Sequence, residues 1–385
     1  MKTTFTLLVA VLSVQFGLAQ SAFVNGVPVS VVNSSTLTLS DSITGLGYVS
    51  NIASNSDGSI LVGSTWTSTF LIDPATSLPT DSLQGFSSNS VYGNDPDEMF
   101  GVRSGTFYSI NISTWAIDSI SLPNTDRITR RPGADEVWVC ADSTIHVVDI
   151  STGMSLATSF TTGSSPYDGS EVRFSADGAT AIKMNWNSNT VAKIDADNKT
   201  VTTMLDMSFA SNLSGVEVTA DGNTAFISAS NDNMLYKIDV NTMTLSDSVE
   251  MPRSPFGIYR HPSSGKMWVV GHFDDIIYIV NPSDLSIEDS IEVGSSPHIV
   301  VFMNTPTGIA EPMLSKASCY PNPTQNSFQM EGMETGDSWI IQDVLGRTVS
   351  SGKALHSNET IDISKLNKGT YMVSTKTSVG KIVKQ

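Results

Sequence analysis

The sequence predicts an all-β protein made of repeated four-stranded units that close into a ring, followed by a second, small all-β domain. Three observations predict this arrangement: a motif that recurs at nearly constant spacing, Asp-Gly turns between apolar runs, and incomplete copies of the unit at both ends of the repeat region. The composition agrees, because only 15% of the residues are charged while Ser, Thr, Asn and Gly abound. A repeat of fixed length constrains the architecture more strongly than any single strand does.

The recurring motif consists of two or three apolar residues, then Asp or Asn, then a small or polar turn. Its Asp or Asn anchors are Asn33, Asp73, Asn111, Asp149, Asp195, Asp239 and Asn281. Successive anchors are 38 to 46 residues apart, which is the length of a β-propeller blade. Each anchor is expected to end a strand, since its side chain can accept a hydrogen bond from the backbone N–H two residues later.

Each copy also contains a second turn, for example the Asp-Gly turns at positions 57–58, 177–178 and 221–222. Asp-Gly between alternating apolar runs indicates a hairpin, because Gly tolerates a positive φ. Each copy therefore contains four short strands, and seven anchors predict a seven-bladed β-propeller over residues 20–305. An open β-sandwich is the alternative fold, but it does not explain a repeat of constant length.

The two ends of the repeat region predict closure of the ring. Val29–Ile43 matches the third and fourth strands of a blade, whereas Pro297–Phe302 matches the first strand. Together they form one composite blade, which leaves no long unpaired strand edge. The second strand of this blade is not identifiable from the sequence, and six blades would result if the composite blade does not form.

The N-terminus has the pattern of a secretory signal peptide at residues 1–19: a lysine, a short apolar run and small residues, Gly17 and Ala19, before the predicted cut. No later segment is long and apolar enough for a membrane helix. Cys140 lies in an apolar strand pattern and is expected to be a buried free thiol, and Trp138 and Trp268 are expected in the core.

The net charge of −17 argues against nucleic acid and against an anionic membrane surface as partners. No metal site, cofactor or catalytic residue is predicted, because cysteine pairs with metal spacing, a Gly-x-Ser-x-Gly elbow, a His-Glu-x-x-His motif and a phosphate loop are all missing from the sequence.

The last three copies, and above all residues 253–294, resemble the YVTN-type propeller repeat of surface-layer and YncE-like proteins. The segment reads Arg253-Ser-Pro-Phe-Gly-Ile, then Lys266-Met-Trp-Val-Val, then Asp275-Ile-Ile-Tyr-Ile-Val-Asn281. The resemblance implies the fold over residues 21–305. It does not imply an activity, since this family has many functions.

Residues 306–318 read as a linker, and residues 319–385 read as a small Ig-like β-sandwich. This domain resembles the type A C-terminal sorting domain of the type IX secretion system of Gram-negative bacteria. The residues that carry the resemblance are Tyr320, Pro321, Asn322, Pro323, Gly346, Arg347, Gly369, Tyr371 and Lys381. The resemblance implies that the secretion machinery is a partner and that the protein is secreted or displayed on the outer cell surface. An Ig-like adhesive module is the alternative.

Candidate ligand-binding residues come from one face of the ring. Alternating strand direction places the loops between strands 2 and 3 on the same face as the loops between blades, and ligand sites form on loops held by a rigid scaffold. The candidates are Trp66, Arg103, Arg127, Tyr167, Asp168, Trp186, Asn231, His272, Asp274 and His298.

Three functions are compatible with these residues. The first is a binding scaffold for a surface glycan, a protein or another envelope component, with Trp66 and Trp186 as stacking surfaces. The second is an extracellular enzyme of the lactonase, quinone-dependent dehydrogenase or lyase type, in which His272, Asp274 and His298 form a metal or acid–base group. The third is a structural or adhesive surface component. A binding role ranks ahead of catalysis, because the chain has only five His and no catalytic motif.

Overall fold

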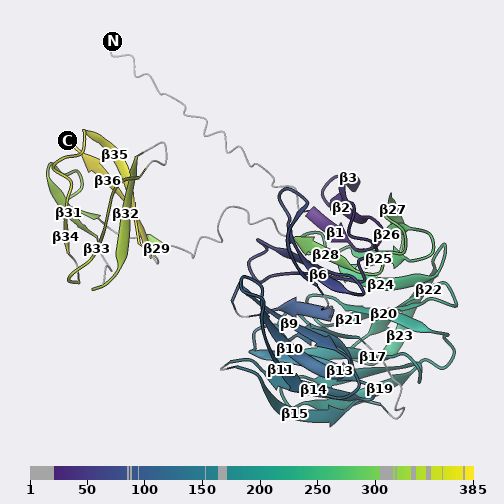
Figure 1. Cartoon of the computed structure of the whole chain (residues 1–385). Coiled ribbons are helices and arrows are strands. Elements are labelled where there is room, and N and C mark those ends of the chain that lie inside the picture. Colours follow the sequence, from purple (N-terminus) through teal and green to yellow (C-terminus); the bar gives the residue numbers. More distant parts are fainter. Residues whose placement is uncertain are drawn as a thin grey trace. The chain divides into compact units, whose positions relative to one another are not determined.

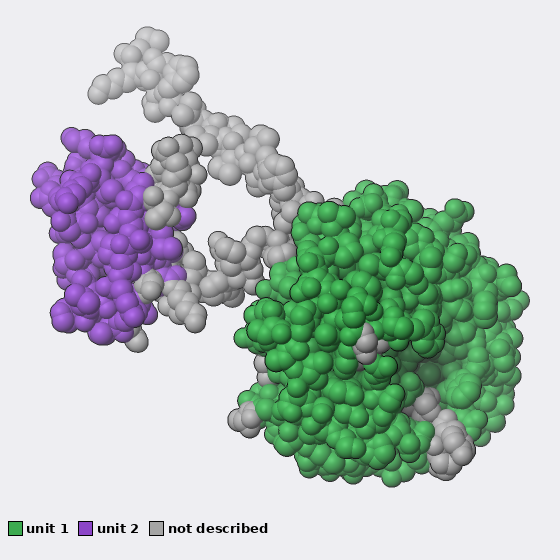
Figure 2. Space-filling model, in the orientation of Figure 1, with its two compact units in different colours: residues 1–305 green, residues 306–385 purple. Residues whose placement is uncertain are grey.

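The computed structural model describes residues 21–385 except 85, 87–88, 94, 152, 164–170, 304–314, 317–318, 331–334, 344–347, 358 and 376–377. The described residues form strands and no helix. The chain divides into two compact units, Met1–Thr305 and Pro306–Gln385 (Figure 2). The predicted signal peptide and most of the predicted linker lie outside the described residues. Over the part of the chain that the structure describes, no helix is long and apolar enough to cross a membrane.

The first unit is a seven-bladed β-propeller, because its described residues form seven antiparallel sheets of four strands each (Figure 1). The innermost strands are β4 (Asn51–Ser54), β8 (Asn89–Tyr92), β12 (Thr125–Arg130), β16 (Val172–Phe174), β20 (Leu213–Val218), β24 (Pro255–Arg260) and β28 (Val300–Met303). The second strands are β1 (Ser21–Val24), β5 (Leu61–Ser64), β9 (Glu98–Arg103), β13 (Glu136–Ala141), β17 (Thr180–Asn185), β21 (Thr224–Ala229) and β25 (Met267–Gly271).

The outer half of each blade is more exposed than the inner half. The third strands are β2 (Val29–Asn33), β6 (Ser68–Asp73), β10 (Thr106–Asn111), β14 (Thr144–Asp149), β18 (Thr190–Asp195), β22 (Met234–Asp239) and β26 (Ile276–Val280). The fourth strands, which are largely solvent-exposed, are β3 (Thr38–Ile43), β7 (Leu78–Gln84), β11 (Ala116–Ser121), β15 (Ser155–Thr161), β19 (Thr200–Asp206), β23 (Thr244–Glu250) and β27 (Ile287–Glu292).

The seven predicted anchors occupy equivalent turns between the third and fourth strands. In every blade the backbone N–H two residues after the anchor donates a hydrogen bond to the anchor's side-chain oxygen, over 2.8–3.2 Å. The predicted strand-ending turn is therefore confirmed in all seven copies.

The composite blade closes the ring as predicted. Its strand order is β28-β1-β2-β3, so the N-terminal and the late segment share one sheet. The second strand, which the sequence did not reveal, is β1, which pairs with β2 on one side and β28 on the other. Asn25 follows β1 and is fully buried. Its Oδ1 accepts hydrogen bonds of 2.7 Å from the backbone N–H groups of His298 and Ile299, and its Nδ2 donates to the carbonyl of Val49 over 3.1 Å.

The hydrophobic core consists of clusters between neighbouring blades. Each adjacent pair of blades shares one, including the pair formed by the last blade and the composite blade, where Trp268 and Val270 pack with Ala22 and Val24. Trp138 and Trp268 are buried, as predicted. Cys140 is a buried free thiol, also as predicted, and its burial raises the pKa of the thiol to about 11.

The second unit is a small β-sandwich of two sheets around one core. The larger sheet contains β29 (Ser315–Lys316), β36 (Ser378–Lys384), β35 (Gly369–Ser374), β32 (Ser338–Asp343) and β33 (Thr348–Lys353). The smaller sheet contains β30 (Cys319–Tyr320), β31 (Ser327–Met330) and β34 (Thr360–Asp362). Phe328, Ile341 and Val373 pack between them. Within the segment expected to be a linker, Ser315–Lys316 forms an edge strand that pairs in parallel with β36.

Candidate functional site

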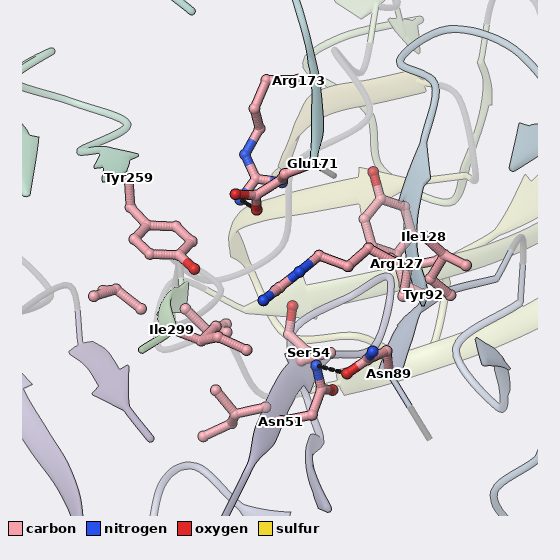
Figure 3. A pocket seen from close by; sticks show the side chains of 15 residues that line it. Asn51, Ser54, Asn89, Tyr92, Arg127, Ile128, Glu171, Arg173, Tyr259 and Ile299 are labelled. Atoms are coloured by element: carbon pink, nitrogen blue, oxygen red, sulfur yellow. Dashed lines mark hydrogen bonds and ion pairs between the residues drawn. The ribbon is translucent and has the colours of Figure 1, made fainter. Parts of the chain in front are cut away.

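A pocket of about 250 Å³, called the channel pocket below, lies among the innermost strands (Figure 3). Residues on or directly before β4, β8, β12, β16, β24 and β28 line it, so six of the seven blades contribute. Its polar side chains include Asn51, Asn89, Arg127, Glu171, Arg173 and Tyr259. This pocket depends on the ring, because residues that are distant in the sequence meet only where the blades converge.

Arg173 in β16 is the centre of a buried charge network. Its Nη2 is 2.5 Å from Oε1 of Glu171, and its Nε is 3.8 Å from Oε2 of Glu217. Its guanidinium also lies 5.5 Å from the centre of the Tyr259 ring. Burial raises the pKa of Glu217 above its usual range although Arg173 acts in the opposite direction. The charge of Arg173 is therefore compensated within the protein, and its position is fixed by two carboxylates and an aromatic face.

Arg127, which was predicted in a loop between blades, lies inside β12 and differs from Arg173. Its side chain extends across the channel pocket (Figure 3). Among the described residues, no hydrogen bond or ion pair reaches its guanidinium. Burial alone would lower its pKa, but the carboxylates of Glu171 and Asp126 outweigh burial and raise it. Arg127 thus keeps a full positive charge, and within the described residues its five N–H donors have no acceptor.

A second pocket of about 610 Å³, called the mouth pocket below, shares Arg127 and Glu171 with the channel pocket. The loop after β17 supplies Trp186, which is 49% exposed. The indole N–H of Trp186 donates a hydrogen bond to the side-chain oxygen of Asn212, which lies before the next blade. Further lining residues are Asp126, Asp142, Ser214, Phe256 and His298. The mouth pocket therefore combines aromatic rings with carboxylate, amide and hydroxyl groups.

Two histidines meet at the edge of the mouth pocket. The ring centres of His272 and His298 are 3.9 Å apart, and both rings contact Phe256. The Nδ1 of His298 lies 3.2 Å from the hydroxyl of Tyr48. Burial, with a smaller effect from His272, lowers the pKa of His298 to about 4. His298 is therefore neutral at neutral pH.

The third member of the predicted histidine group has other partners. Asp274 accepts a hydrogen bond of 2.7 Å from Tyr278 and pairs with Arg253 over 3.6 Å. Across the described ranges, no group of three or more His, Cys, Asp or Glu is arranged to hold a metal ion. Of the predicted group, His272 and His298 are therefore in contact, whereas the carboxylate of Asp274 interacts with Tyr278 and Arg253 instead.

The other predicted residues divide into three groups. Arg127, Trp186 and His298 line the mouth pocket. Trp66, which is 76% exposed, Arg103 and Asn231 line neither pocket. Tyr167 and Asp168 lie outside the described residues.

Sequence reasoning did not single out Glu171, Arg173 or Tyr259. A signal was present, because Arg173, Glu217 and Tyr259 occupy the same register position in three successive blades, opposite Ile182, Phe226 and Trp268. Charged and polar residues at a repeated position of an innermost strand indicate a polar channel. The predicted candidates were all residues expected in loops, so these strand residues were not among them.

The sorting residues of the second unit cluster around the terminal strand. The Nδ2 of Asn322 donates to the carbonyl of Lys381 over 2.6 Å, and the N–H of Val383 donates to Oδ1 of Asn322 over 2.9 Å. Tyr371 is buried in β35, where its hydroxyl donates to the carbonyl of Asn367. Tyr320, Pro321 and Pro323 flank Asn322, and Gly369 begins β35. Gly346 and Arg347 lie outside the described residues.

A comparison with protein families identifies this unit. Residues 318–385 match the family described as "Secretion system C-terminal sorting domain". The protein is therefore exported by the type IX secretion system, to the cell surface or the medium of a Gram-negative bacterium, and its C-terminal domain interacts with the secretion machinery.

Comparisons with solved structures concern the propeller. The periplasmic gluconolactonase of Pseudomonas aeruginosa is 14% identical over 74% of this chain and 99% of that one, with a TM-score of 0.61. A putative 6-phosphogluconolactonase from Bacteroides fragilis is 14% identical over 74% and 98%, with a TM-score of 0.60. A functionally unknown protein from Desulfotomaculum acetoxidans is 16% identical over 73% and 98%, with a TM-score of 0.58. Such identities show the fold alone. No curated protein matches the chain significantly.

Proposed function

We propose that the propeller acts outside the cell as a binding scaffold and that it binds a glycan in the mouth pocket. Within this proposal the propeller is of the YVTN/YncE-like type that residues 253–294 resemble. The observation that carries the proposal is an exposed tryptophan, Trp186, held by Asn212 at the wall of a concave pocket. The type IX sorting domain supports an extracellular ligand.

The chemistry of the mouth pocket suits a sugar ring. A volume of about 610 Å³ falls in the usual range for small-ligand pockets. The Trp186 and Phe256 rings offer apolar faces on which the C–H side of a sugar can stack. Asp126, Asp142 and Asn212 offer acceptors for sugar hydroxyls. Because blade cores hold the loops that carry these groups, little ordering is needed on binding.

Two tryptophans provide a matched test. Trp186 and Trp66 are both exposed and both lie in loops between second and third strands, but only Trp186 lines the mouth pocket. We expect Trp186→Ala to weaken glycan binding at least about tenfold, as buried aromatic contacts do at binding sites. Trp66→Ala should leave affinity within about twofold. A glycan array followed by calorimetry measures both, and thermal melts check the fold. Equal effects of the two substitutions would contradict the proposal.

An extracellular enzyme is the second candidate, favoured by the neutral His298 next to His272 at the pocket edge. A neutral imidazole can accept a proton from a substrate or a water molecule. Conversion of a bound lactone or glycan that disappears in the His272→Ala His298→Ala double variant would support catalysis. Binding without any conversion supports the scaffold.

A further inference from the structure

We propose that the ligand is an acidic sugar, a uronate, whose carboxylate enters the channel pocket and binds Arg127. This inference rests on the proposed glycan-binding function and adds the chemical class of the glycan. It starts from the two pockets, which share Arg127 and Glu171 in their linings. A ligand stacked in the mouth pocket can therefore reach Arg127 with one end.

The charges around the channel pocket leave one cation without an ion-pair partner in the described residues. Arg173 is compensated by Glu171 at 2.5 Å and Glu217 at 3.8 Å. Arg127 has no such contact within the described ranges. The guanidinium of Arg127 faces both pockets. A carboxylate is its best geometric match, since two N–H groups can donate to the two oxygens.

The surroundings favour a single carboxylate over a larger or more highly charged anion. The channel pocket holds about 250 Å³, and its walls include apolar residues such as Ile128, Ile299 and Val301. At the mouth, Asp126 and Asp142 add negative charge. These carboxylates accept hydrogen bonds from sugar hydroxyls but repel a dianion such as a phosphate ester. A ligand with one acidic group in the channel pocket and hydroxyl groups in the mouth pocket matches the chemistry of both pockets.

The test compares matched ligands on the full-length mature protein. Methyl glucuronide, its methyl ester and methyl glucoside differ only at the carboxyl position, and glucose 6-phosphate carries a dianion there. We expect the uronate to bind at least about tenfold more tightly than the ester, the glucoside or the phosphate, because it alone places a monoanion against Arg127. Galacturonate and galactose repeat the comparison for a second sugar.

Two substitutions assign the preference to Arg127. Arg127→Met retains most of the side-chain volume and should reduce the ratio of uronate to glucoside affinity to about one. The control Arg253→Met removes another arginine of the same unit, one that is 62% exposed and pairs with Asp274. It should leave the ratio unchanged. If Arg127→Met fails to fold, the acid-against-ester comparison on the unaltered protein decides.

The outcomes separate this inference from the function on which it rests. Three results would overturn the uronate assignment: equal affinity for acid and ester, tighter binding of the phosphate, or a preference that survives in a folded Arg127→Met variant. If Trp186→Ala still weakens sugar binding, the glycan-binding function itself stands. No binding of any sugar would overturn the glycan-binding function itself.

Discussion

At the scale of single residues, His298 shows how burial at the mouth pocket affects the protonation of an imidazole. Its pKa is lowered from 6.5 to about 4 by burial and by His272. In the unfolded chain the imidazole takes up a proton as the pH falls below 6.5, whereas in the folded protein it stays neutral until about pH 4. The unfolded state then binds more protons, so stability falls between these two pH values and is unaffected by this group above 6.5.

The pH effect can be isolated by one substitution. Between pH 7 and pH 5, the melting temperature of the unaltered protein should fall further than that of His298→Gln, because glutamine takes up no proton in either state. Thermal melts at several pH values measure the difference. The same fall in both proteins would show that His298 does not contribute.

At the scale of elements, β1 and the residue after it decide whether the ring closes. β1 contributes Ala22, Phe23 and Val24, all fully buried. Asn25 then connects the N-terminal segment to His298, Ile299 and Val49 through its side chain. The composite blade is therefore held by both strand pairing and a buried amide.

The closure can be tested at Asn25. Asn25→Ala removes the acceptor of two backbone N–H groups and the donor to two carbonyls, those of Val49 and Ser50, and should lower the free energy of unfolding by about 1–3 kcal/mol. Asn198→Ala is the control, since Asn198 is exposed and its side chain donates to Asp195 in the same turn, so its effect should stay within about 0.5 kcal/mol. Chemical denaturation measures both. A loss no larger at Asn25 than at Asn198 would argue against a role in closure.

At the scale of the whole molecule, folding and export belong to different units. Every core cluster of the propeller consists of residues up to Met303, while the sorting residues surround β36 of the second unit. A protein that ends at Thr305 should therefore melt as the propeller does in the full-length protein but remain inside the outer membrane.

Cell fractionation with immunoblotting tests this separation. The full-length protein should be found at the surface or in the medium, and the shortened protein in the periplasm. A shortened protein that still reaches the medium would mean that the sorting domain is not required for export.

The repeat made the propeller predictable from the sequence. Each anchor forms a local hydrogen bond to the backbone two residues later, so the same sequence pattern marks the same turn in all seven copies. The strand β1 was not predictable in the same way. It has only four residues, and although it pairs with β2, its other partner β28 lies about 280 residues later. Only the closed ring therefore gives it the position of a second strand.

The sequence by itself determined the repeat, its turns and the sorting domain, since these depend on local spacing and turn chemistry. Only the tertiary structure decided which candidates meet. Trp66 and Trp186 are equivalent by local sequence, yet one lines the mouth pocket and the other does not. Arg127 and Arg173 are both arginines of innermost strands, but among the described residues only Arg173 forms ion pairs, with carboxylates from two blades. Such differences arise from distances across the ring, and no local pattern encodes them.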